Sequence, residues 1–171
     1  MYKHTLIKTL VGILACAVLV STSYAASQPR YPVYGWQVRC SVDSFTDVRR
    51  CPITASDGKY LFIISKIEEF PRYFNFSITD IAISGRSNYS LDPSILIRVD
   101  QNEAIDLANH YFGNSGEGSV YYTIDQEIIN QMKAGLELRM RINPSHEPRQ
   151  DITLSLSGFT YSFDRMLQIR Q

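Results

Sequence analysis

Short runs in which apolar and polar residues alternate constrain the fold of this chain more than any other feature of its sequence. The clearest run is 136–142, where leucine, methionine and isoleucine alternate with glutamate and arginine. Successive side chains of a strand point to opposite faces, so alternation of this kind indicates a half-buried β-strand. Further strands are predicted at 34–40, 51–54, 59–67, 73–83, 95–99, 104–108, 119–123 and 151–157. A one-residue shift in the apolar pattern after Ile78 also predicts a β-bulge near 79–80.

Two short helices interrupt the strand pattern. The first is predicted from a capping box formed by Thr123 and Gln126 to a stop at Gly135. The second is C-terminal, because the apolar residues of 159–167 recur at helical spacing. Many short strands with only two short helices indicate a mainly β protein, a single-domain β-sandwich or open barrel.

The first 25 residues have the pattern of a secretory signal peptide. Lys3 and Lys8 precede the apolar run 10–20, and Ser23-Tyr24-Ala25 places small residues at the −3 and −1 positions of a cleavage site. The sequence therefore predicts an exported protein, periplasmic or secreted, whose mature part is the single domain 26–171.

A lipid anchor is the alternative for the same segment. Cys16 follows Ile13-Leu14-Ala15, which resembles a lipid-attachment site, although Leu14 is bulky for that role and a better cleavage site lies downstream. A membrane span is not expected in the mature chain, because a spanning helix needs about 20 apolar residues.

The charge of the mature chain argues against polyanionic partners. Without Lys3 and Lys8, fifteen of the seventeen basic residues remain against seventeen acidic ones, a net charge of about −2. The basic residues are scattered rather than clustered, so neither nucleic acid nor an anionic membrane is an expected partner.

Cys40 and Cys51 are the two cysteines of the mature chain. An even count in an exported protein indicates a structural disulfide. The alternative, a reactive or metal-binding pair, lacks a nearby histidine or second cysteine pair that would complete a four-ligand site.

No reaction chemistry is predicted from the remaining residues. His110 and His146 have no neighbouring partners that would make them catalytic or metal-binding. The glycine-rich segment 113–118 lacks the pattern of a phosphate-binding loop, and the acids lack the spacing of a calcium loop. We therefore expect no enzyme activity, no cofactor and no bound metal.

Three motifs resemble the invasion-associated locus B family of bacterial exported proteins. They are Trp36-x-Val38-x-Cys40 followed by Cys51, the predicted helix 124–135 followed by the strand 136–140, and Leu154-Ser-Leu-Ser-Gly-Phe-Thr160 running into a final helix. The resemblance implies a β-rich periplasmic protein linked to host-cell invasion or envelope function, and it brings no catalytic residues.

The chain departs from that family in its middle. Relatives carry a second cysteine pair there, whereas the corresponding stretch 111–120 contains no cysteine. The resemblance is therefore to a divergent member.

The leading hypothesis is a non-enzymatic protein that binds another protein, a host or envelope component. Tyrosine is favoured at protein interfaces, and several tyrosines flank the glycine-rich segment. The predicted contact residues are Tyr111, Asn114, Glu117, Tyr121 and Tyr122.

A periplasmic inhibitor or immunity protein is the alternative hypothesis. Such a protein blocks an enzyme by inserting a loop into its cleft. A loop that protrudes well beyond the scaffold would favour this alternative.

Overall fold

The computed structural model describes residues 35–82, 91–114, 118–145 and 147–169. The predicted signal peptide at 1–25, with Cys16, lies outside the described residues, as do Glu117 and His146. No helix among the described residues has the length and apolar character needed to cross a bilayer.

The described chain is mainly β, with two α-helices and one short 3₁₀ helix. The strands are β1 (Gln37–Val38), β2 (Ser41–Val42), β3 (Arg49–Arg50), β4 (Ile53–Ser56), β5 (Tyr60–Lys66), β6 (Tyr73–Asp80), β7 (Leu96–Val99), β8 (Ile105–Asp106), β9 (Tyr111–Asn114), β10 (Ser119–Asp125), β11 (Glu137–Ile142) and β12 (Gln150–Ser155). The helices are η1 (Leu107–His110), α1 (Gln126–Ala134) and α2 (Phe159–Gln168).

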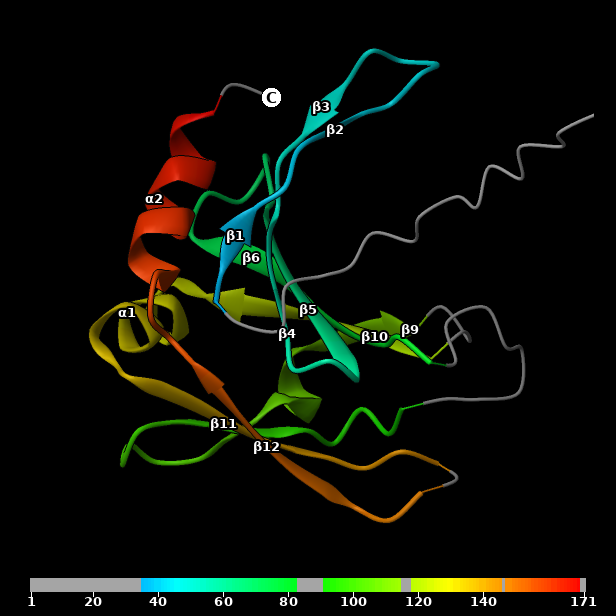
Figure 1. Ribbon diagram of the computed structural model, residues 1–171, viewed down its shortest axis with the longest axis vertical. Helices are drawn as coiled ribbons and strands as arrows, with labels where there is room; N and C mark the ends of the chain where they lie inside the picture. The colour runs from blue at the N-terminus through cyan, green and yellow to red at the C-terminus, as the bar shows by residue number, and fades with distance from the viewer. Residues whose placement is uncertain (1–34, 83–90, 115–117, 146, 170–171) are drawn as a thin grey trace, which may run out of the picture. The chain divides into compact units, whose positions relative to one another are not determined.

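The strands form two larger sheets and one hairpin, with antiparallel pairing throughout (Figure 1). The six-stranded sheet has the order β1-β4-β5-β6-β10-β9, and the four-stranded sheet has the order β12-β11-β7-β8. The third pairing is the β2–β3 hairpin. The sheets do not close into a barrel, so the prediction of a mainly β, sandwich-like domain with a C-terminal helix is confirmed.

Both larger sheets bury alternate side chains in one shared core. From the six-stranded sheet come Phe62, Phe76 and Ile78, and from the four-stranded sheet come Leu138 and Met140. Burial of such side chains is the main favourable contribution to folding. The other face of the four-stranded sheet, which carries the polar residues of the alternation, is left at the surface.

Helix α2 covers β1 and β4 at one end of the six-stranded sheet. The Phe159 ring meets the Trp36 ring edge-on at 5.0 Å between centroids, and Phe163 meets Phe74 at the same distance. The Ser162 hydroxyl donates a hydrogen bond of 2.7 Å to the Trp36 carbonyl oxygen. The apolar spacing that predicted this helix therefore corresponds to aromatic packing on Trp36, just before β1, and on Phe74 of β6.

The predicted bulge near 79–80 is wrong. Strand β6 pairs with β5 and β10 in continuous register up to Asp80 and Thr79 respectively. The strand ends at Asp80, whose carboxylate accepts a hydrogen bond from the Ala82 backbone N–H at 2.9 Å. The shift in the apolar pattern therefore marks the end of a strand, and Ile81 lies at the surface.

The start of α1 also differs from the prediction. Strand β10 continues to Asp125, whose carboxylate accepts hydrogen bonds from the N–H groups of Glu127 and Ile128, each at 3.0 Å. Asp125 is thus the N-cap, in place of the predicted capping box at Thr123.

The predicted helix end at Gly135 is confirmed, but for another reason. The backbone at Gly135 has a φ of −89°, which is not left-handed. A Cβ atom there would lie 2.3 Å from Cγ1 of Val99, so the close approach of α1 to β7 requires glycine.

Candidate interaction surfaces

The β2–β3 hairpin extends away from the two larger sheets (Figure 1). Ser41 pairs with Arg50 and Val42 with Arg49. Every residue of the segment 41–50 is exposed, so the hairpin contributes no side chain to the core.

A disulfide closes the base of this hairpin. Cys40 is bonded to Cys51, which confirms the predicted pairing. Cys51 is buried two residues before β4, whereas Cys40 is exposed. Next to the disulfide, on the side of the sheet, the Arg39 N–H donates to the Pro52 carbonyl oxygen at 2.9 Å. The hairpin is therefore joined covalently to the edge of the six-stranded sheet.

The tip of the hairpin is held by its own hydrogen bonds. The Asp43 carboxylate accepts from the N–H groups of Phe45 and Thr46 at 2.9 and 3.0 Å. These backbone hydrogen bonds lower the pKa of Asp43, so its charged form is favoured. The Asp43 N–H donates to the Val48 carbonyl, and the Asp47 N–H donates to the Asp43 carbonyl, each at 2.9 Å. These local hydrogen bonds give the tip a defined conformation of its own.

Three apolar side chains are exposed on this ordered hairpin. Phe45 at the tip is 95% exposed, Val42 is 60% exposed and Val48 is 44% exposed. Phe45 was not among the contact residues predicted from the sequence. The available signal was a lone phenylalanine between two cysteines, but its exposure depends on where the hairpin points.

The predicted contact residues divide between the surface and the core. Tyr111 and Tyr121 are at least partly exposed, and Phe112, which sequence reasoning did not single out, is 59% exposed. The Phe112 and Tyr121 rings lie 6.1 Å apart on adjacent strands β9 and β10. Asn114 ends β9, where it pairs with Val120. These residues stay a predicted contact surface, which we call the β9–β10 face.

The prediction is wrong for Tyr122. Its side chain is fully buried, and its hydroxyl donates a hydrogen bond of 3.0 Å to the Pro93 carbonyl oxygen. Burial raises the pKa of the Tyr122 phenol above its usual range. Tyr122 therefore belongs to the core and offers no surface to a partner.

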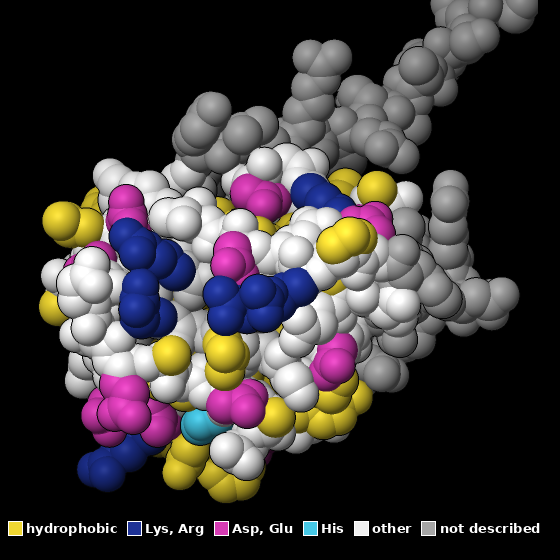
Figure 2. Space-filling model, turned by 90° about the horizontal axis from the view of Figure 1, so that it is seen from below, with side chains coloured by type: hydrophobic (Ala, Val, Ile, Leu, Met, Phe, Trp, Pro, Cys, Tyr) yellow, Lys and Arg dark blue, Asp and Glu magenta, His cyan; other side chains and the backbone are white. Residues whose placement is uncertain are grey.

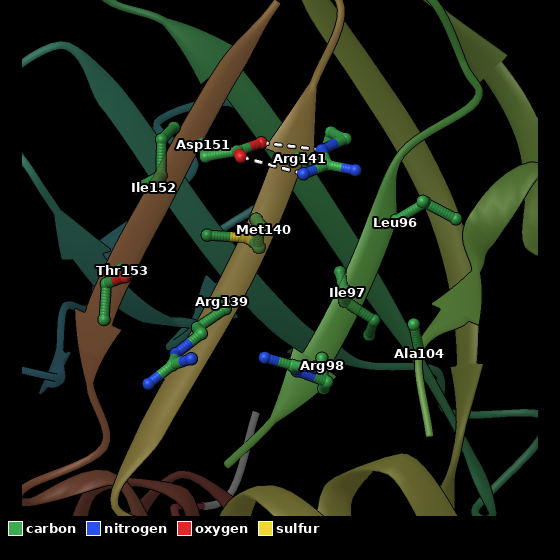
Figure 3. Close-up of a pocket in the computed structure, with 10 residues that line it drawn as sticks. All are labelled: Leu96, Ile97, Arg98, Ala104, Arg139, Met140, Arg141, Asp151, Ile152 and Thr153. Atoms are coloured by element: carbon green, nitrogen blue, oxygen red, sulfur yellow. Dashed lines mark hydrogen bonds and ion pairs between the residues drawn. The ribbon is translucent and has the colours of Figure 1, made fainter. Parts of the chain in front are cut away.

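A groove of about 310 Å³ lies on the outer face of the four-stranded sheet (Figure 3). Three arginines from two strands stand along it, Arg98 on β7 and both Arg139 and Arg141 on β11. Seen from below, this side of the domain carries grouped basic side chains with acidic ones beside them (Figure 2). Sequence reasoning placed Arg139 and Arg141 on the polar side of a strand but did not bring Arg98 to them.

One of the three arginines is fully paired within the groove. The Arg141 guanidinium donates two hydrogen bonds to the Asp151 carboxylate, at 2.7 and 2.9 Å. This contact lowers the pKa of Asp151. Arg139 donates one bond of 3.1 Å to Glu137.

The remaining candidate sites show no assembled chemistry. The His110 imidazole Nδ1 lies 3.1 Å from the Thr123 carbonyl oxygen. Within residues 35–82, 91–114, 118–145 and 147–169, no group of three or more His, Cys, Asp or Glu side chains could hold a metal ion.

Comparison with known proteins gives a match in fold. No family model matches the chain, and no curated protein matches its sequence. The crystal structure of invasion associated protein B from Bartonella henselae superposes with a TM-score of 0.54 at 14% identity, over 80% of this chain and 94% of that one. At this level of identity the two chains share a fold, which agrees with the resemblance found in the sequence.

Proposed function

We propose that this chain is an exported, non-enzymatic protein that acts by binding another protein, and that the β2–β3 hairpin is its main contact. The observation that carries the proposal is Phe45, an aromatic side chain 95% exposed at the tip of a disulfide-closed hairpin. Large aromatic side chains are the usual anchors of protein interfaces.

The hairpin is suited to binding because its conformation is already restricted before a partner binds. The disulfide at its base and the Asp43 hydrogen bonds at its tip already restrict its conformation. Binding therefore loses less conformational entropy than it would with a flexible loop. Burial of Phe45 in an apolar pocket would contribute about 2–3 kcal/mol.

The charges of the hairpin favour a protein over a lipid surface. Asp43 and Asp47 lie next to the tip, and Arg49 and Arg50 lie on the returning strand, so the hairpin has no net charge. Two acids beside Phe45 would oppose insertion into an anionic membrane. A pocket on a folded protein can match both signs.

Export and family membership complete the proposal. The predicted signal peptide would direct the chain to export, and the disulfide fits the oxidising compartment that it would reach. The motifs and the shared fold support a place among the invasion-associated locus B proteins, in the periplasm or outside the cell. The partner would then be a host or envelope protein.

An inhibitor or immunity protein is the second candidate. The projecting hairpin favours it, because a rigid loop with an apolar tip can enter the cleft of an enzyme (Figure 1). The binding protein and the inhibitor would both use the hairpin as their contact, and they differ in whether the partner is an enzyme.

The test immobilises residues 26–171 and compares the unsubstituted protein with Phe45→Ser. Leu136→Ser is the matched control, because Leu136 is 78% exposed and lies outside the hairpin. We expect a protein from envelope extract or host-cell lysate to be retained by the unsubstituted chain and by Leu136→Ser. Phe45→Ser should retain at least about tenfold less of that protein, because it loses one buried anchor.

Equal retention by Phe45→Ser would rule out the hairpin as the main contact. If the retained protein is an enzyme, its activity is measured with and without the chain. Loss of activity that depends on Phe45 would identify the inhibitor, and unchanged activity would favour adhesion or envelope binding.

A further inference from the structure

Arg98 and Arg139 form a cross-strand pair of like charges in the groove of the four-stranded sheet. They are directly opposite each other in the β7–β11 pairing, so both side chains stand on the outer face. Figure 3 shows Arg98 extending from β7 toward the strand that carries Arg139. Like charges at directly opposite positions destabilise a sheet. An anion between the two guanidinium groups would remove that repulsion.

Most hydrogen-bond donors of this pair are unused. Within the described part of the chain, Arg98 makes no hydrogen bond or ion pair, and Arg139 makes one, to Glu137. Arg141, in contrast, is satisfied by two bonds to Asp151. A guanidinium presents five N–H donors in a planar fork that fits a carboxylate. Arg98 thus has no carboxylate partner within the described residues, and Arg139 keeps donors beyond its one bond to Glu137, so the two can share a further carboxylate.

The walls of the groove suit a side chain of a peptide. On the outer face, Leu96 and Thr153 stand along the groove, whereas the side chains of Ile97, Met140 and Ile152 are buried on the opposite, core face of the same strands. A volume of about 310 Å³ is at the small end of ligand sites in proteins. Leu96 and the aliphatic stems of the arginines supply the apolar surface against which the stem of a glutamate or aspartate would lie.

We propose that this groove binds an acidic segment of a partner protein, with one of its carboxylates held between Arg98 and Arg139. The acids on the same face, Glu137 and Asp151, narrow the choice of ligand. They would repel a polyanion such as nucleic acid, whereas a peptide can place single carboxylates between them. The site is separate from the hairpin and does not depend on the function proposed above.

The experiment titrates the mature protein with N-acetyl-hexaglutamate amide and follows binding by calorimetry and by the arginine side-chain NMR signals. We expect saturable binding that shifts the Nε–H signals of Arg98 and Arg139. Arg98→Gln and Arg139→Gln should each weaken it about tenfold, the effect of one charge-assisted hydrogen bond. Arg72→Gln, which removes the same charge from an exposed position outside the groove, should change the affinity less than about twofold.

Other results would overturn the proposal. These are the absence of saturable binding, or equal weakening by Arg72→Gln, which would indicate attraction to charge alone. Glutarate or inorganic phosphate binding as tightly as the peptide would assign the site to a small free anion. Phe45→Ser is expected to bind hexaglutamate like the unsubstituted protein, so failure of this site and failure of the hairpin can be told apart.

Discussion

Phe45 and Phe163 are the same side chain in opposite surroundings. Phe45 is 95% exposed at the tip of a hairpin that gives nothing to the core, whereas Phe163 is fully buried between α2 and the six-stranded sheet. The hairpin is ordered by a disulfide and local hydrogen bonds, and the α2 region is ordered by aromatic packing. The side chain proposed as the contact thus lies apart from the packing that stabilises the core, so replacing Phe45 should have little effect on stability.

Phe163→Ala should have the largest effect. The ring packs on Phe74 and Phe159, and Lys133 Nζ lies 4.9 Å from its centroid. Its removal leaves a cavity, so we expect the free energy of unfolding to fall by about 3–5 kcal/mol. Phe45→Ala should change it by less than about 0.5 kcal/mol. Urea unfolding of both variants measures the contrast, and comparable losses would contradict it.

Removal of the disulfide by Cys40→Ser with Cys51→Ser comes next. The cross-link closes a loop with a sequence separation of 11, and a loop of this size contributes about 3 kcal/mol in the chain-entropy model. We expect a loss of that order in urea unfolding, together with faster amide exchange in 41–50. A slow-exchanging hairpin in the double variant would show that its own hydrogen bonds suffice.

Tyr122→Phe tests the contrast between a buried and a more exposed side chain within the single strand β10. It removes the hydroxyl that donates to the Pro93 carbonyl, so we expect a loss of about 1–2 kcal/mol. Tyr121→Phe, one residue away on the opposite face, should cost almost nothing. Thermal unfolding of the two variants gives the answer, and equal losses would mean that both hydroxyls are structural.

The core can also be probed by alkaline pH. Burial raises the pKa of Tyr60 to about 12, so its neutral form is favoured in the folded chain. The folded protein then binds more protons than the unfolded one above the ordinary phenol pKa. Tyr60 should therefore contribute no change below pH ~10 and a fall of about 1 kcal/mol in the free energy of unfolding by pH ~11, to which Tyr122 adds. Tyr60→Phe should have a smaller fall, measured by urea unfolding across this range.

Arg98→Gln should give the smallest change and the opposite sign. It removes the like-charge pair with Arg139, so we expect the free energy of unfolding to rise by about 0.2–1 kcal/mol. Arg72→Gln serves as the control that changes only the net charge. A loss of stability in Arg98→Gln would show that the pair is not repulsive in the folded sheet.

The strands and the C-terminal helix could be predicted because their apolar residues recur at fixed spacing. Strand β11 lies within the predicted run, and α2 covers the predicted apolar face. Spacing does not report where a strand stops, so the pattern around Asp80 was read as a bulge. Apolar spacing also does not decide which of two suitable residues is the N-cap of a helix. Asp125 is the N-cap of α1 in place of Thr123, because β10 stays paired with β6 up to Asp125.

The surfaces were harder to predict because they depend on pairing between distant segments. The adjacent residues Tyr121 and Tyr122 are chemically identical, and only the register with β6 decides which one is buried. Arg98 and Arg139 become neighbours through the β7–β11 pairing. The exposure of Phe45 depends on the direction of the hairpin, which extends away from the sheets.

The segment from Cys40 to Cys51 is a covalent ring within the chain. Its closing bond and its tip hydrogen bonds lie inside that ring, and its side chains between the two cysteines make no contribution to the buried core. It can therefore be made alone as an oxidised synthetic macrocycle, which keeps Phe45 at the tip. Such a macrocycle would compete for the partner proposed for the hairpin, and it would be a starting point for a chemical probe of that proposed contact in living cells.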